Sequence, residues 1–133
     1  MLTLYWGSGS PFAWRVMLAL AVKKMDYEGK LISFSSGELS TPEYLAMSPR
    51  GQVPLITDGN YSLTESLAIM QYLEARDSSV PIFGKTAQET GDIWRSIQLS
   101  AGYIEKPVFD VAKTIFKGQL DELRDTVVEA RKL

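Results

Sequence analysis

The chain has 133 residues, a formal net charge of −2 and 45% hydrophobic residues, a composition typical of a soluble globular protein. Its length suits one ordinary domain, or one small domain plus part of another. It contains no cysteine and no histidine, which excludes disulfide bonds, cysteine nucleophiles and a histidine general base, and leads us to expect no metal. It also lacks a basic stripe, a membrane-length apolar run and a secretion signal, so we expect a cytoplasmic protein with no nucleic-acid or membrane partner.

The chain opens with a predicted strand at residues 2–6, an apolar and aromatic run that ends at Gly7. A helix is predicted over residues 12–24, because Ser10 is a favoured N-cap residue and Pro11 suits the first helical position. This helix is apolar almost all round. We therefore expect it to be buried on two sides, against a sheet and against further helices.

The following segments complete a domain with the element order βαβαββα. Alternating and apolar runs predict strands at residues 28–34, 53–57 and 61–63, and helical spacing predicts helices at residues 42–47 and 66–75. The sequence Asp58-Gly59-Asn60 is a hairpin turn signal, so the last two strands are expected to pair directly.

A polar, proline-containing run at residues 77–81 is the one plausible domain boundary. The predicted parts are a first domain at 1–77, a linker at 78–85 and an all-helical domain at 86–133. A long helix is expected to reach about residue 117, with a kink near Gly102 and Pro107, and a second helix to begin near residue 119. The amphipathic pattern runs to the last residue, so we expect this helical domain to be incomplete.

Ser10 is the first candidate functional residue. Its hydroxyl lies at a predicted helix N-terminus, where it could donate a hydrogen bond to a bound thiolate. The alternative is a plain N-cap that accepts from a backbone N–H one turn on, and the spacing by itself favours this alternative.

Two later motifs carry further polar groups. If the Val53-Pro54 bond is cis, Val53 could pair through its main chain with an extended ligand, with Gln52 beside it. The low frequency of cis X-Pro bonds, about 5–6%, favours a trans proline at an edge strand instead. Ser66 could bind a carboxylate while Glu65 accepts from an ammonium, or the two residues could simply cap a helix.

Three segments together resemble the glutathione S-transferases: SPFAWRV at 10–16, SPRGQVPL at 48–55 and TESLAI at 64–69. The likeness covers the whole first domain at the family's spacing and is most similar to the serine-type members of the tau, phi and zeta classes and to bacterial relatives. Residues 93–109 look like the family's first long helix, a less specific match. The resemblance implies an α/β thioredoxin-like N-terminal domain followed by an all-helical domain.

The resemblance also implies that glutathione is the co-substrate and that it binds along the first domain in a defined orientation. Its γ-glutamyl end would meet Glu65 and Ser66, its cysteinyl main chain would meet Val53 before a cis Pro54, and its thiol would meet Ser10. Phi-class members carry a basic residue or histidine for the glycyl carboxylate, where this chain has Leu39 and Ser40. Ser40 would substitute as a neutral donor, at roughly half the strength of a charge-assisted bond. The full set of implied glutathione-binding residues is Gln52, Val53, Pro54, Glu65, Ser66 and Ser40, with an electrophile pocket near Phe12, Tyr103 and Phe109.

The expected function is therefore a glutathione transferase that holds the thiol as a thiolate for attack on a small electrophile. Glutathione-dependent isomerisation and peroxide reduction are alternatives, because they use the same thiolate. The Trp14-Arg15-Val16 triplet resembles zeta-class isomerases. A non-catalytic binding or scaffold module is another alternative. The resemblance implies a homodimer formed through the helix at 66–75 and the long helix, with Arg15 in a structural role.

Overall fold

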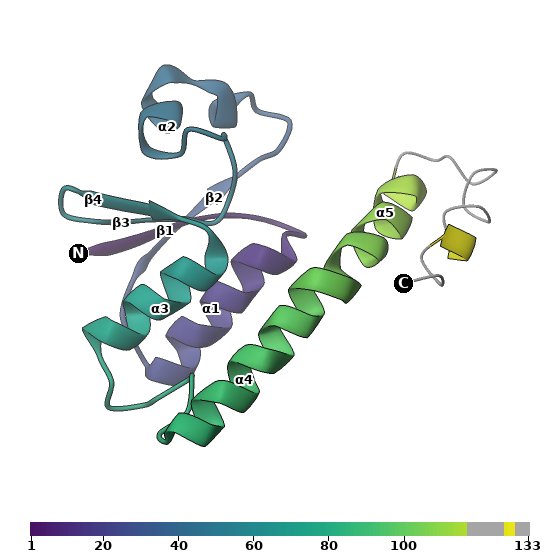
Figure 1. The fold of residues 1–133 in the computed structure, drawn as a ribbon. Helices are drawn as coiled ribbons and strands as arrows, with labels where there is room; N and C mark the ends of the chain where they lie inside the picture. The colour runs from purple at the N-terminus through teal and green to yellow at the C-terminus, as the bar shows by residue number, and fades with distance from the viewer. Residues whose placement is uncertain (117–126, 130–133) are drawn as a thin grey trace. The chain divides into compact units, whose positions relative to one another are not determined.

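The structure is a computed structural model that describes residues 1–116 and 127–129. It divides into two compact units, Met1–Ile82 and Phe83–Leu133 (Figure 1). The division falls within the segment 78–85 that the sequence predicts as a linker.

The first unit is built on a four-stranded sheet with the strand order β2-β1-β3-β4. Strand β1 runs parallel to β2 and antiparallel to β3, and β3 and β4 form an antiparallel hairpin. The bounds of the strands are Leu2–Gly7 (β1), Glu28–Ile32 (β2), Leu55–Asp58 (β3) and Tyr61–Thr64 (β4). Together with its helices this is a thioredoxin-like fold, and it confirms the predicted order βαβαββα.

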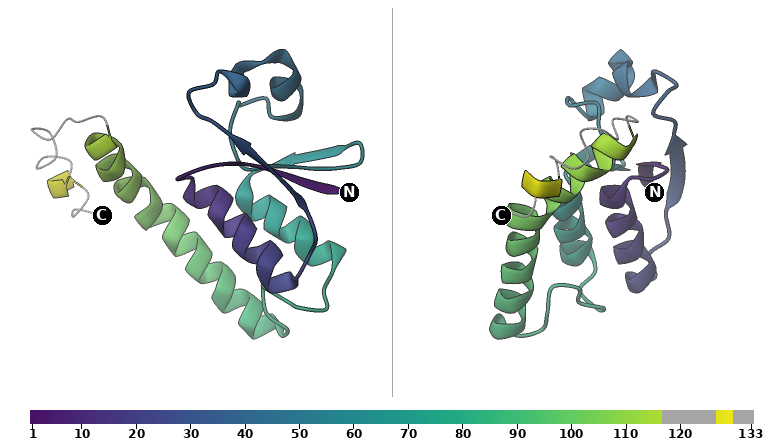
Figure 2. Two further views of the ribbon diagram at one scale, coloured as in Figure 1. Left: turned by 180° about the vertical axis from the view of Figure 1, so that it is seen from behind. Right: turned by 90° about the vertical axis from the view of Figure 1, so that its right-hand side faces the viewer.

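The helices of this unit cover both faces of the sheet. Their bounds are Pro11–Lys23 (α1), Pro42–Met47 (α2) and Ser66–Arg76 (α3), with a short 3₁₀ turn at Glu38–Ser40. Helices α1 and α3 lie side by side on one face and α2 lies on the other (Figures 1 and 2). Neighbouring strand residues point to opposite faces, so Leu55 packs with Tyr44 of α2 whereas Ile56 packs with α1 and α3.

Helix α1 is covered on one side only within this unit. Val16, Ala19 and Leu20 are buried against the sheet and α3, and Ala13 is also buried. On the opposite side, three large apolar residues at four-residue spacing have exposed fractions of 51% (Trp14), 67% (Leu18) and 55% (Val22). The expected packing of this helix against a sheet and against another helix is confirmed for the sheet and α3. The side that carries Trp14, Leu18 and Val22 is exposed.

A buried ion pair between α1 and α3 holds the last residues of the first unit in place. The Nζ of Lys23 donates to a carboxylate oxygen of Glu74 at 2.7 Å and to the carbonyl of Val80 at 2.8 Å. The same Glu74 oxygen accepts from the main-chain N–H of Ile82 at 3.2 Å. Residues 80–82 are thus held against α1 and α3, which explains why the compact unit extends to Ile82.

From Ala87 onward, every described residue of the second unit is helical. Helix α4 (Ala87–Leu99) begins with a capping box of Thr86 and Glu89, and a π-helical turn at Ser100–Ile104 joins it to α5 (Glu105–Phe116). Pro107 has no N–H, and its ring crowds the carbonyl one turn earlier, which accounts for the wider turn at the predicted irregularity.

The helix predicted from near residue 119 falls mostly outside the described residues. Within its predicted range, the structure describes residues 127–129, which are helical. Among the residues that the structure describes, no helix has the length and apolar character needed to cross a bilayer.

Candidate functional site

The pairing of the strands brings the three predicted motifs to one end of the sheet. Tyr5 near the end of β1 lies opposite Leu55 at the start of β3, and Leu55 lies opposite Thr64 at the end of β4. The Ser10 turn follows β1, the Val53-Pro54 bond precedes β3, and Glu65 follows β4. All three motifs therefore lie beside this end, from Ser10 at one side to Glu65 at the other.

Ser10 is the N-cap of α1, with 8% of its surface exposed. Its Oγ accepts from the N–H of Ala13 at 3.2 Å, which confirms the capping interpretation. Because a hydroxyl is both donor and acceptor, this bond leaves the Ser10 proton able to donate to a ligand. The capping and ligand-binding interpretations of Ser10 are therefore compatible.

The Val53-Pro54 peptide bond is cis. This is the isomer that the family resemblance implies, whereas the frequency of cis bonds alone favours trans. Pro54 is buried, while Val53 is partly exposed and Gln52 is exposed. Within the described part of the chain, no hydrogen bond of the Val53 main chain is seen, which leaves it able to pair with an extended ligand.

Two residues that the sequence analysis missed hold the turn before this bond. The carbonyl of Gln52 accepts from the Tyr44 hydroxyl at 3.0 Å and from the Ser48 hydroxyl at 3.1 Å. The N–H of Gln52 donates to Ser48 Oγ at 3.2 Å. The one signal in the sequence is a tyrosine in a short helix, since a buried tyrosine hydroxyl usually finds a partner.

The Tyr44 hydroxyl remains a donor over a wide pH range. The side chain is buried, and this burial, together with the negative charge of Glu38, raises the pKa of Tyr44 to about 12. At neutral pH the group is therefore protonated and holds the Gln52 carbonyl.

Glu65 occupies the N-cap position of α3 with φ +68°, a conformation that is uncommon for a residue other than glycine and that concentrates at functional sites. Its side chain makes no capping hydrogen bond, so the capping interpretation is wrong for Glu65. The carboxylate instead lies 3.1 Å from a guanidinium nitrogen of Arg50.

Ser66 is the first residue of α3 and is buried. Its Oγ lies 3.5 Å from a guanidinium nitrogen of Arg15, a long hydrogen bond that links α1 to α3. The guanidinium of Arg15 also lies 5.0 Å from the centre of the Phe12 ring. Arg15 thus joins the Ser10 side of the site to the Ser66 side.

The remaining predicted site residues are Ser40, Phe12, Tyr103 and Phe109. Ser40 is exposed at the end of the 3₁₀ turn, where its N–H donates to the Gly37 carbonyl. Phe12 belongs to the first unit, whereas Tyr103 and Phe109 belong to the second, so neither unit assembles the predicted electrophile pocket alone.

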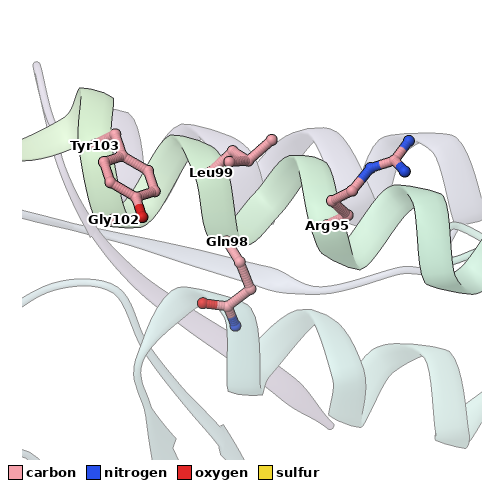
Figure 3. A pocket seen from close by; sticks show the side chains of 5 residues that line it. All are labelled: Arg95, Gln98, Leu99, Gly102 and Tyr103. Atoms are coloured by element: carbon pink, nitrogen blue, oxygen red, sulfur yellow. The ribbon is translucent and has the colours of Figure 1, made fainter.

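The second unit has two open pockets, and Tyr103 lines both of them. One, of about 530 Å³, is lined by Arg95, Gln98, Leu99, Gly102 and Tyr103 (Figure 3). The other, of about 350 Å³, is lined by Tyr103, Ile104, Pro107, Val108 and Val111. Across the described residues of both units, no group of three or more potential ligand side chains could hold a metal ion.

Comparison with known proteins identifies the family. A family model described as the glutathione S-transferase N-terminal domain matches residues 1–75. The chain is 47% identical to glutathione S-transferase A from Pleuronectes platessa over 79 residues, which is 59% of this chain and 35% of that protein. It is 31% identical to a zeta-class glutathione S-transferase from Euphorbia esula over 118 residues, or 89% of this chain and 52% of that protein.

A solved glutathione S-transferase from the Antarctic clam Laternula elliptica matches 98% of this chain and 63% of its own length, with 35% identity and a TM-score of 0.80. The chain therefore spans less than two thirds of each of these relatives. Both its first 75 residues and its described fold place the chain in the glutathione S-transferase family.

Proposed function

We propose that this chain binds glutathione across the end of the sheet described above and takes part in its transfer to small electrophiles. The observation that carries the proposal is the convergence of a helix-capping serine, a cis Val53-Pro54 bond and an outward-turned Glu65 at one end of the sheet. Family membership supports the use of glutathione in general.

In this proposal glutathione lies along the start of β3 as an added strand. Val53 pairs with the cysteinyl main chain, and Gln52 lies beside it. The N–H and hydroxyl of Ser66 hold the γ-glutamyl carboxylate at the positive end of α3, and Glu65 accepts from the ammonium. Ser40 offers a neutral hydroxyl to the glycyl carboxylate.

The thiol of glutathione then lies at Ser10, which would stabilise its deprotonated form. A free thiol has a pKa near 8.5, and lowering it by about two units requires roughly 2.7 kcal/mol in favour of the anion. A hydroxyl donor to a charged group contributes about 1.5–3 kcal/mol, and the helix N-terminus about 0.3–1 kcal/mol more. These two contributions suffice without a histidine base.

The test compares Ser10→Ala with Ser10→Gly. Both variants lose the hydroxyl, but alanine at an N-cap costs about 1 kcal/mol of stability whereas glycine costs only a few tenths. We expect both variants to raise the pKa of the bound glutathione thiol by about one to two units, as measured by the absorbance of the thiolate. Both should also slow conjugation of a chlorodinitrobenzene substrate at mildly acidic pH.

An unchanged pH profile in both variants would reject the thiolate mechanism. An effect in Ser10→Ala alone would assign the loss to the weakened helix cap. Retention on glutathione resin without turnover would favour the binding-module alternative, and turnover of an isomerisation or peroxide substrate alone would favour those reactions.

The proposal extends to a homodimer formed through α3 and α4 and to a cytoplasmic location. The solution mass of the chain, measured by sedimentation, tests the dimer directly.

A further inference from the structure

The exposed ion pair between Arg50 and Glu65 lies at the proposed γ-glutamyl subsite. The guanidinium and carboxylate are 3.1 Å apart, and the two side chains are 71% and 65% exposed. A pair this open to water stabilises the fold little, so a ligand can exchange for either partner at small cost.

The position of Arg50 is fixed by the turn that carries it. Ser48, which is fully buried, bonds both the N–H and the carbonyl of Gln52, and the N–H of Gly51 donates to the Ser48 carbonyl at 2.8 Å. Gly51 has φ +58°, and a Cβ there would lie 2.7 Å from the Leu39 carbonyl oxygen. The main chain of the turn is therefore tightly held, and Arg50 projects from it to Glu65.

The main chain also fixes the direction of Glu65. Its positive φ turns the side chain away from the capping position of α3, and its carboxylate meets Arg50 instead of the helix N–H groups. The carboxylate that would accept the ligand ammonium is thus already neutralised by a cation of this chain.

We propose that Arg50 is a displaceable counter-ion of Glu65 that sets the affinity and selectivity of the γ-glutamyl subsite. This inference rests on the proposed function. The ammonium of glutathione takes the place of the guanidinium at Glu65, and Arg50 moves into solvent. Arg50 therefore weakens the binding of glutathione. It weakens the binding of a cation without a carboxylate more strongly, because such a ligand makes no contact with Ser66 that offsets the displacement of Arg50.

The experiment measures glutathione binding to the 133-residue chain by calorimetry at low and high salt. We expect Arg50→Gln to tighten binding by about two- to five-fold at low salt, because the competing cation is gone, and the gain to shrink at high salt. Arg50→Lys keeps a cation at Glu65 and should bind as the unmodified chain does. The matched control is Lys106→Gln, which removes one positive charge from an exposed ion pair of α5 and should leave binding unchanged.

A glutathione analogue without the γ-glutamyl amino group separates competition from general charge effects. With this analogue no cation exchanges at Glu65, so Arg50→Gln should give no gain. Weaker or unchanged glutathione binding in Arg50→Gln, while the unmodified chain binds, would overturn the role of Arg50 alone. Absence of glutathione binding to the unmodified chain and to every variant would overturn the proposed function as well.

Discussion

At the scale of single residues, the main chain before the cis bond is held by two side chains, those of Tyr44 and Ser48. Tyr44 and Ser48 converge on the carbonyl of Gln52 and so fix the main chain that leads into the cis bond. Neither residue is conspicuous in the sequence, because their role arises from the packing of α2 against the sheet. Ser10 is the opposite case, since its capping role is readable from the Ser-Pro pair alone.

Replacement of Tyr44 by phenylalanine tests the role of its hydroxyl. We expect a cost of about 1 kcal/mol at neutral pH, because one hydrogen bond to the Gln52 carbonyl is lost. The pKa of Tyr44 is raised from 10.0 to about 12 in the folded chain, so the folded state holds this proton more tightly than the unfolded state. The stabilisation is therefore present below pH 10 and is lost as the pH rises toward 12.

The Tyr44→Phe variant lacks this group, so its free energy of unfolding should fall less than that of the unmodified chain across the same alkaline range. Urea unfolding at neutral pH and at several alkaline values measures the difference. Parallel losses in the two proteins would contradict the assigned pKa shift.

At the scale of elements, a buried ion pair links helices α1 and α3 near the end of the first unit. The side chain of Lys23 is fully buried at the end of α1, and Glu74 on α3 is 17% exposed. The periodicity of each helix is visible in the sequence. The pairing of Lys23 with Glu74 is not, because it joins residues 51 apart in the chain.

Replacement of Lys23 by methionine is expected to cost about 3–5 kcal/mol, because it leaves the mostly buried carboxylate of Glu74 without its cation. The double variant Lys23→Met with Glu74→Leu removes both charges and should recover much of that loss. Urea unfolding of the single and double variants gives the coupling energy. Additive losses in the double variant would show that the two charges act independently.

At the scale of the whole molecule, one side of α1 is an exposed apolar surface of the first unit. Trp14, Leu18 and Val22 lie on it and are more than half exposed. The chain spans about a third to a half of the two curated relatives compared above. Apolar residues on nearly all sides of α1 predict that two of its sides are buried. How many sides are buried depends on which other elements pack against the helix.

Leu18→Lys and Leu20→Ala compare the two sides of the same helix. Leu18 is 67% exposed, so its replacement should change the free energy of unfolding by less than about 0.5 kcal/mol. Leu20 is fully buried, so its truncation should cost about 2–5 kcal/mol. Urea unfolding of the 133-residue chain measures both. A cost for Leu18→Lys as large as that for Leu20→Ala would mean that this side of α1 is covered in solution.

The sequence by itself determined the elements of the first unit and their order, because helix caps, turns and hydrophobic periodicity act between near neighbours. Strand ends shifted by one or two residues, as at β2, which ends at Ile32 rather than at residue 34. The family motifs also indicated which residues are candidates for binding glutathione.

Only the tertiary structure decided the relations between distant segments. These are the convergence of the three motifs at one end of the sheet, the positive φ of Glu65 and its pairing with Arg50. Each depends on packing between residues far apart in the chain, and local propensity carries no information about such contacts. The single covered side of α1 has the same origin, since burial is a property of what surrounds a helix as well as of its own residues.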